Sequence, residues 1–397
     1  MKFLIIDDEP FVLKLLSRQL ANLGFDNTVA LEHPRDALAI LEPDPSSFDM
    51  VLLDLQMPDM DGVEFVRHLV RISYTGGLVL ISGEDQRILH TVERLANAHR
   101  LRVMGALHKP VSPAQLGAVI DNAPQDTERM PRMIYTSGEL RRALSNNELI
   151  NHYQPQVELG TGRVVGVEAL VRWQHSSDGL VYPDQFVGTA EDDGLIDDLT
   201  RIVLANALAQ ARQWHDAGMG LQVSINVSMD NLVALDFADY VAHEVEKSGV
   251  PLASIVLEVT ESRLMKNPLV PLDILTRLRL KHIGLSIDDF GTGHSSLAQL
   301  RDIPFDELKV DRGFVHGASE YAPLRAIVEA SLGMAQHLGM KTVAEGVEDQ
   351  QDWDFLRGTG CDLAQGYFIA RPMAADAVLA WIPEWESRLP MLIKTKS

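Results

Sequence analysis

The chain has 397 residues, of which 46% are hydrophobic and 23% charged, a composition typical of globular proteins with room for two or three domains. Its formal net charge of −21 disfavours non-specific binding to nucleic acid or anionic membranes, so we expect neither DNA nor a membrane as partner. No apolar stretch approaches the ~20 residues that span a bilayer, and the N-terminus turns acidic too early for a signal peptide. The single cysteine, Cys361, excludes an intrachain disulfide and fits a reducing compartment, so we expect a cytoplasmic protein.

Strand and helix patterns alternate over the first ~120 residues, which predicts a doubly wound domain with a five-stranded parallel sheet. The predicted strands are 2–6, 27–31, 50–53, 77–81 and 102–107. After the first strand, apolar residues at helical spacing predict one helix face made of Phe11, Leu15, Leu16, Leu20 and Leu23. We place this domain at residues 1–122. Two prolines and mixed charges indicate a linker at 123–134, which leaves 135–390, a length suited to one α/β barrel.

Polar residues stand where the strands of the first domain end. Asp7 and Asp8 follow the first strand, Asp54 the third, Ser82 the fourth and Lys109 the fifth. Ligands of such sheets bind at the carboxyl ends of the strands, beside the point where strand order reverses. Two carboxylates can hold Mg²⁺ while a third attacks phosphorus, and a lysine and a hydroxyl stabilise the added charge. The cluster therefore predicts phosphoryl chemistry.

These residues closely resemble the response-regulator receiver family, over about residues 1–122. The motifs are Asp7-Asp8, the stretch from Asp54 to Gly62, Ser82-Gly83 and Lys109-Pro110. The resemblance implies that Asp54 accepts phosphate from a cognate histidine kinase. It also implies one Mg²⁺ on Asp7 and Asp8, phosphate contacts from Ser82 and Lys109, and a cis Lys109-Pro110 bond. Such domains often carry an aromatic switch residue where this chain has Ala106, so phosphorylation is read out differently or weakly. A receiver fold kept only for dimerisation is the alternative.

A second set of apolar runs, from residue 163 onward, ends repeatedly in a polar residue. The endings are Glu168, Asn226, Glu258, Asp288-Asp289, Lys309, Glu345 and Gln365. A charge inside a buried strand is costly unless it is paired or metal-bound, and a parallel barrel gathers its strand ends at one face. We therefore expect one pocket rich in oxygen ligands, which favour Mg²⁺ or Mn²⁺ over Zn²⁺.

The chemistry expected of this pocket is metal-assisted hydrolysis of a phosphoester. The adjacent Asp288-Asp289 pair can bridge two ions, which would hold the attacking and leaving oxygens. Lys309 is suited to hold or polarise a water, and Glu345 to bind metal or take a proton. Arg172, interpreted as lying one helical turn after Glu168, is suited to pair with a phosphate.

The same residues resemble the EAL family of cyclic di-GMP phosphodiesterases, over about residues 135–385. The ordered motifs are Tyr153-Gln154-Pro155, Glu168-Ala169-Leu170 with Val171-Arg172-Trp173, Asn226-Val227-Ser228, Glu258-Val259-Thr260-Glu261, Asp288 to Gly293, Leu308-Lys309-Val310-Asp311, Ala344 to Glu348 and Gln365-Gly366-Tyr367. Three letters alone would carry no weight, but eight motifs in order are specific. The implied fold is a TIM (β/α)8 barrel variant whose first strand runs antiparallel to the others.

The resemblance also implies roles for single residues. Metal ligation falls to Glu168, Asn226, Glu258 and Asp288, with Asp289 and Glu345 serving a second ion, and Lys309 positions the attacking water. Leu170, Arg172, Gln365 and Gln154 would contact the nucleotide, while Glu261, Asp311 and Glu348 would support the site. The implied reaction opens cyclic di-GMP to linear pGpG.

A loop from Asp288 to Ser296 is expected to cover the pocket, because Gly291 and Gly293 allow turns that other residues resist. Glu261 is expected to hold this loop, and the family uses the loop to link dimerisation to catalysis. We therefore expect a homodimer or higher homo-oligomer, with activity regulated by phosphorylation of Asp54. The alternative from another class is a non-catalytic cyclic di-GMP receptor that signals through its receiver or a partner. A DNA-binding regulator lacks any helix-turn-helix candidate after the linker.

Overall fold

The computed structural model describes residues 1–83, 86–99, 101–121, 135–260, 269–291 and 297–393. The chain divides into two compact units, Met1–Met130 and Pro131–Ser397. The predicted linker at 123–134 lies outside the described residues, so its limits remain a prediction. Among the residues that are described, no helix is both long enough and apolar enough to cross a lipid bilayer.

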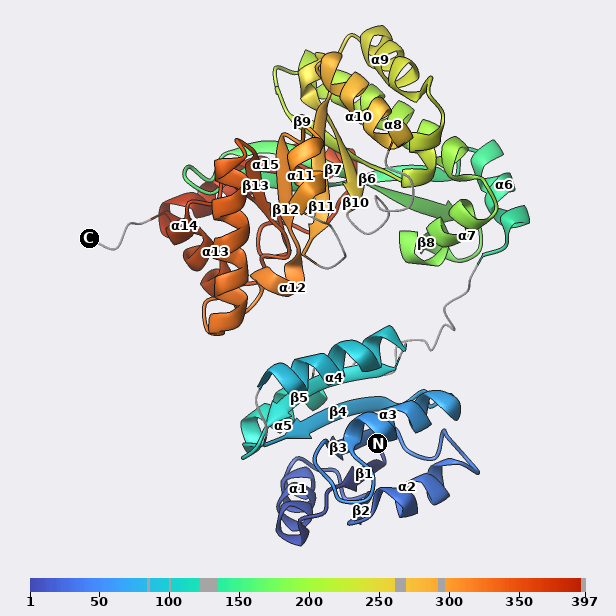
Figure 1. Ribbon diagram of the computed structural model, residues 1–397, viewed down its shortest axis with the longest axis vertical. Coiled ribbons are helices and arrows are strands. Elements are labelled where there is room, and N and C mark those ends of the chain that lie inside the picture. Colours follow the sequence, from blue (N-terminus) through green and yellow to red (C-terminus); the bar gives the residue numbers. More distant parts are fainter. Residues whose placement is uncertain (84–85, 100, 122–134, 261–268, 292–296, 394–397) are drawn as a thin grey trace. The chain divides into compact units, whose positions relative to one another are not determined.

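The first unit is a five-stranded parallel sheet in the order β2-β1-β3-β4-β5, flanked by helices (Figure 1). The strands are β1 Phe3–Ile6, β2 Thr28–Leu31, β3 Met50–Asp54, β4 Gly77–Ser82 and β5 Arg102–His108. The helices are α1 Pro10–Asn22, α2 Pro34–Leu41, α3 Gly62–Arg71, α4 Gln86–Ala98 and α5 Pro113–Asp121. This is the predicted doubly wound sheet, with each strand within a residue or two of its expected range.

Both faces of this sheet are buried, which explains why its strands are continuous apolar runs. In β1, Leu4 and Ile6 enter one core while Phe3 and Ile5 enter the other. The predicted face of α1 is partly wrong, because Phe11 is 74% exposed and Leu15 and Leu23 are also exposed. The buried residues are Leu13, Leu16, Gln19 and Leu20, so the helix is rotated from the expected orientation.

The second unit is a closed eight-stranded barrel in the order β6-β14-β13-β12-β11-β10-β9-β7, shut by pairing of β6 with β7. The strands are β6 Leu149–Glu158, β7 Val164–His175, β9 Gln222–Val227, β10 Ile255–Thr260, β11 Gly284–Phe290, β12 Glu307–Val310, β13 Lys341–Ala344 and β14 Leu363–Ala364. A short strand, β8 Gly179–Val181, adds a hairpin to β7. Strand β6 is antiparallel to both of its neighbours, as the family resemblance implied.

Helices surround this barrel (Figure 1). They are α6 Ser137–Ser145, α7 Val187–Asp192, α8 Ile196–Asp216, α9 Phe237–Ser248, α10 Leu269–Leu280, α11 Leu297–Asp302, α12 Arg312–Val315, α13 Ala322–His337, α14 Gln350–Thr359 and α15 Ala375–Leu392. Three-residue to five-residue 3-10 helices occupy Pro183–Gln185, Met229–Val233 and Leu252–Ser254.

Alternation along the barrel strands separates the apolar core from the polar interior. In β9, Val223 and Ile225 join the main hydrophobic core. Neighbouring Ser224 and Asn226 point to the other face, into the barrel, because successive side chains of a strand alternate. The same alternation places Glu258, Asp288 and Lys309 inside the barrel, so its interior is lined by polar groups at its carboxyl end.

Candidate active site

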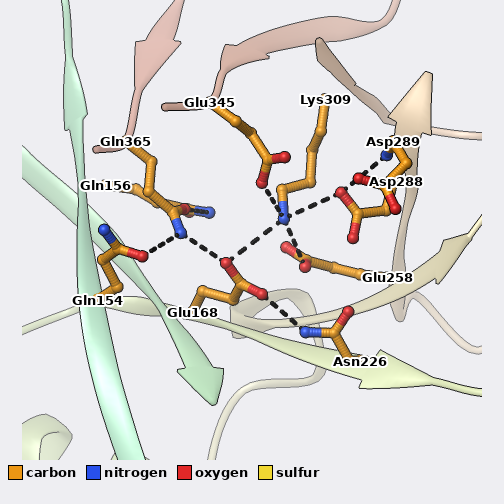
Figure 2. Close-up of polar contacts among 10 residues, drawn as sticks. All are labelled: Gln154, Gln156, Glu168, Asn226, Glu258, Asp288, Asp289, Lys309, Glu345 and Gln365. Carbon is orange, nitrogen blue, oxygen red and sulfur yellow. Dashed lines mark hydrogen bonds and ion pairs between the residues drawn. The ribbon is translucent and has the colours of Figure 1, made fainter. Parts of the chain in front are cut away.

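Lys309 is the centre of a cluster of carboxylates inside the barrel (Figure 2). Its side chain is fully buried, and Nζ lies 2.7 Å from both Glu258 Oε2 and Glu345 Oε1. Asp288 Oδ1 is at 3.3 Å and Glu168 Oε2 at 3.5 Å. Strands β7, β10, β11 and β12 and the residue after β13 supply these groups. The predicted convergence of polar strand endings therefore occurs.

Glu168 is oriented by amide groups from neighbouring strands. Asn226 Nδ2 donates to Glu168 Oε1 over 2.7 Å, and Gln365 Nε2 donates to Glu168 Oε2 over 2.5 Å. Gln365 Nε2 also donates to Gln154 Oε1, and Gln156 Nε2 donates to Gln365 Oε1, both over 3.0 Å. These hydrogen bonds hold the carboxylate of Glu168 in one orientation. Because Asn226 donates through its nitrogen, its amide oxygen remains available as a ligand.

The second group of oxygens comes from Asp288, Asp289 and Glu345. One carboxylate oxygen from each lies within 4.8 Å of the others, a spacing that one cation can satisfy. Asp289 has a left-handed backbone with φ of 55°, and its N–H donates to Asp288 Oδ1 over 3.0 Å. Such a conformation in a residue other than glycine is uncommon, and it turns the two adjacent carboxylates toward one site. Beyond Gly291, the predicted covering loop lies outside the described residues at 292–296.

Burial and mutual repulsion raise the pKa of several of these acids. Burial raises the pKa of Glu258 well above its usual value, with the charges of Glu168 and Asp288 adding to the effect. Burial likewise raises the pKa of Glu345 to about 8 and that of Asp289 to about 6. Although burial opposes its charge, Lys309 has a pKa raised well above normal by Glu168 and the other carboxylates. Added positive charge is what such a cluster would bind most readily.

The oxygen atoms available here fit divalent cations. Glu258 Oε1 is buried and accepts no hydrogen bond from the described residues. An orphan carboxylate oxygen is costly in a protein interior unless a cation or proton meets it. The donor set is entirely oxygen, which matches the preference of Mg²⁺ and Mn²⁺.

The residues expected to contact a nucleotide lie on β7, on β6 and directly after β14. Leu170 is half-buried and Arg172 buried, two and four positions beyond Glu168 on the same face of β7. The helical spacing assigned to Arg172 is wrong, because residues 164–175 form a strand. Residues four apart share a face in a strand as they nearly do in a helix, so the spacing did not distinguish the two. Gln365 and Gln154 contact each other beside Glu168, as described above.

The supporting residues fall in different places. Asp311 caps α12 by accepting a hydrogen bond from the Gly313 N–H over 2.9 Å, and its charge raises the pKa of Asp289. Glu348 is placed against His316, with its carboxylate 4.0 Å from Nε2, and its N–H donates to Asp352. Glu261 lies outside the described residues.

The receiver residues also converge. Lys109 Nζ lies 2.8 Å from Asp7 Oδ2 and 3.2 Å from Asp54 Oδ1. Carboxylate oxygens of Asp7, Asp8 and Asp54 lie within 4.8 Å of one another. Burial raises the pKa of Asp54 to about 6, against the opposing charge of Lys109. Buried Ser82 ends the adjacent strand, and the Lys109-Pro110 bond is cis.

Sequence reasoning missed two features of the barrel site. Gln156 follows the Tyr153-Gln154-Pro155 motif and shares a strand face with Gln154, so period-two alternation was a usable signal. Tyr182 lies over the guanidinium of Arg172, with the ring centroid 5.0 Å from Cζ. No motif marks Tyr182, and only the pairing of β8 with β7 reveals its neighbour.

Comparison with known protein families matches each unit separately. The response regulator receiver domain model matches residues 3–121, and the EAL domain model matches residues 137–372. Cyclic di-GMP phosphodiesterase RocR of Pseudomonas aeruginosa is 31% identical over 93% of this chain and 95% of its own length. Cyclic di-GMP phosphodiesterase NbdA of the same organism is 45% identical, but this chain spans only 31% of it.

Two solved structures resemble the chain over a length close to that of its barrel. The complex of the PaMucR phosphodiesterase with c-di-GMP is 39% identical, covers 61% of this chain and 98% of that one, and has a TM-score of 0.58. The EAL domain of Mycobacterium smegmatis DcpA is 31% identical over 60% of this chain and 97% of its own, with a TM-score of 0.51.

Proposed function

This chain belongs to the EAL domain family and carries a response regulator receiver domain ahead of it, and we propose that it hydrolyses cyclic di-GMP to linear pGpG. The observation that carries the proposal is the convergence of Glu168, Glu258, Asp288 and Glu345 on buried Lys309. The names of RocR and NbdA and the ligand in the PaMucR complex support the choice of substrate.

Two divalent ions, Mg²⁺ or Mn²⁺, would be held by the oxygens of this pocket. Glu168, Asn226, Glu258 and Asp288 would bind the first, and Asp289 and Glu345 the second. When bound, such a pair stabilises the attacking and leaving oxygens of a displacement at phosphorus. The orphan oxygen of Glu258 and the 4.8 Å grouping of Asp288, Asp289 and Glu345 support this assignment.

The chain's own residues would position water and substrate. Lys309 would donate a hydrogen bond to the attacking water, and Glu345, whose carboxylate lies 2.7 Å from Lys309 Nζ, is placed beside that water to receive the proton it loses. The water oxygen would bond to phosphorus, one ester P–O bond would break, and the leaving oxygen would take up a proton, so that the dinucleotide ring opens. Leu170, Arg172, Gln154 and Gln365 would hold the nucleotide.

Regulation would come from the receiver. Asp54 would accept a phosphoryl group from a histidine kinase, with Mg²⁺ on Asp7 and Asp8 and with Ser82 and Lys109 contacting the phosphate. The added charge would shift a receiver surface, repack a homo-oligomer, and so move the loop after Asp289. Cys361 is the single cysteine and is buried, so the chain has no intrachain disulfide, which supports the proposal of a reducing, cytoplasmic setting.

The test is turnover of cyclic di-GMP by the full-length protein with Mg²⁺ or Mn²⁺, with and without a small phosphodonor. Chromatography should show linear pGpG, and Glu168→Gln should abolish it. Asp54→Asn should keep basal turnover and lose the response to the phosphodonor, and mass measured in solution should report the oligomer. Binding without turnover would favour the receptor function, and intact substrate under all conditions would refute hydrolysis.

A further inference from the structure

Strand β7 forms one wall that leads from the carboxylate cluster toward the mouth of the barrel. Glu168, Leu170 and Arg172 share a face because side chains alternate along a strand. At about 3.3 Å per residue, Arg172 lies roughly 13 Å beyond Glu168 along the strand. The wall therefore runs from metal-binding oxygens to a cationic group.

Arg172 is held in a fixed position at the end of this wall. Its side chain is only 6% exposed, and Nη1 donates to the Val171 carbonyl over 2.8 Å. The buried Nε has no hydrogen-bond partner among the described residues. A buried guanidinium with an unused donor is costly unless a ligand or water meets it.

Tyr182 covers this guanidinium from the neighbouring strand. Val181 of β8 pairs with Trp173 of β7, so the next residue, Tyr182, comes opposite Arg172. The ring centroid lies 5.0 Å from Arg172 Cζ, within the range of a cation–π contact. Although Arg172 lies against the ring, 49% of Tyr182 is exposed.

Exposed aromatic residues are few in the described part of the barrel unit, and they gather here. Only Tyr182 and Tyr367 among its described aromatic residues are as much as 49% exposed. Tyr367 stacks with Arg371 at 4.2 Å and follows Gln365, which bonds Glu168. Burial lowers the pKa of Arg172, and both tyrosines lie near enough to oppose that shift. Two partly exposed rings therefore lie near the arginine at the end of this wall.

We propose that Tyr182, supported from beneath by Arg172, is a stacking shelf for one purine base of the bound cyclic dinucleotide. This inference rests on the proposed function, because it assigns the base of the same substrate to a surface. Stacking on an aromatic ring is worth about 1–3 kcal/mol per base and tolerates any base, since every base has a π-face. Tyr182 would thus supply affinity, while base identity is read elsewhere.

The chain offers a matched control for this shelf. Tyr240 on α9 also stacks on an arginine, with Arg201 Cζ 3.9 Å from its ring, but it lies on the helical layer. Tyr182→Ala should raise KM for cyclic di-GMP about tenfold, equivalent to about 1.4 kcal/mol, with kcat nearly unchanged. Tyr182→Phe should match the wild type, and Tyr240→Ala should leave KM unchanged.

These measurements distinguish a failure of the Tyr182 stacking proposal from a failure of the proposed hydrolysis of cyclic di-GMP. An unchanged KM in Tyr182→Ala, or a Tyr182→Phe variant as weak as Tyr182→Ala, would overturn the shelf. Inhibition by cyclic di-AMP should weaken by the same factor as cyclic di-GMP affinity, whereas a loss confined to guanine would show recognition of the base edge instead. If the wild type turns nothing over, the proposed function fails, and equilibrium dialysis of the same variants still tests the shelf.

Discussion

Two lysines, one in each unit, meet carboxylates at the ends of parallel strands, and the difference between them is burial. Lys109 is 18% exposed and pairs with Asp7, Asp54 and the exposed Glu9. Lys309 is fully buried among four carboxylates. A partly exposed lysine can follow a phosphoryl group that arrives and leaves, whereas a buried one fixes the geometry of a permanent site. Under the proposed function, the same residue types would serve a switch in one unit and a reaction in the other.

Replacing the two lysines should give the largest contrast. Lys309→Met should lower turnover of cyclic di-GMP by at least about 10²-fold, the effect of losing one polar group from a preorganised site. It leaves buried carboxylates without their counter-charge, which costs up to about 3–5 kcal/mol of unfolding free energy in chelator-treated protein. Urea unfolding measures this cost. Lys109→Met should leave turnover of the unphosphorylated protein unchanged, and an equal loss in both variants would break the comparison.

The affinity of the barrel site for Mn²⁺ should depend strongly on pH. Glu345 and Asp289 have pKa values raised to about 8 and about 6, so each holds a proton below its value and must release it to bind metal. Affinity should therefore fall as pH drops below about 8, by up to about tenfold per unit, and more steeply below about 6. Calorimetric titration at several pH values measures it. Glu345→Gln should weaken the step near pH 8 without removing it, because the pKa of buried Glu258 is also raised well above normal; a flat profile in the wild type would contradict the assignment.

The rate at which a small phosphodonor phosphorylates the receiver should fall in a single step as the pH is lowered. As the proposed phosphoacceptor, Asp54 would attack phosphorus as a carboxylate, and burial raises its pKa to about 6, so it holds a proton below that pH. The rate of phosphorylation by a small phosphodonor should fall by about tenfold per unit below the step, which bound Mg²⁺ moves lower. Intact-protein mass spectrometry follows the label. Asp54→Asn should take no label. A rate that stays level down to pH 4 would contradict this prediction, because bound Mg²⁺ would then offset the whole effect of burial on the Asp54 pKa.

The smallest effect is expected at the exposed edge of the receiver cluster. Glu9 is 60% exposed and lies 3.3 Å from Lys109 Nζ, so Glu9→Gln should change the unfolding free energy by less than about 1 kcal/mol. Asp7→Asn, at a side chain that is 1% exposed, provides the buried counterpart and should change Mg²⁺ binding as well. Thermal unfolding with and without Mg²⁺ compares the two; equal responses would mean that burial does not set the strength of these contacts.

The residues of the barrel site were easier to predict from the sequence than the buried face of helix α1. Polar residues such as Glu258 and Lys309 interrupt buried apolar runs, and burial makes such interruptions too costly to be accidental. The convergence of strand endings follows from the barrel itself, so the cluster around Lys309 was predictable without contacts. On α1, by contrast, Phe11 and Leu15 are apolar but exposed, and spacing alone could not orient the helix.

Features set by pairing between strands escaped prediction. Arg172 was assigned a helical offset from Glu168 because residues four apart share a face in both a helix and a strand. Tyr182 meets Arg172 only through the register of β8 on β7, which involves no local pattern. The left-handed backbone of Asp289 likewise depends on the fold around it, since neighbouring glycines would have been the expected place for that turn.

Gln365 links the antiparallel junction of β6 and β14 to the candidate active site. Its side chain joins Gln154 and Gln156 of β6 to Glu168 of β7, so amides at the junction of β6 and β14 also orient the Glu168 carboxylate. If β6 and β14 moved apart, the hydrogen bonds of Gln365 would break or shift, and the carboxylate of Glu168 would rotate. Contacts at this junction of strands therefore also set the geometry of the candidate active site. Substitutions of Gln154, Gln156 or Gln365 should be tolerated only when the partner residues change with them.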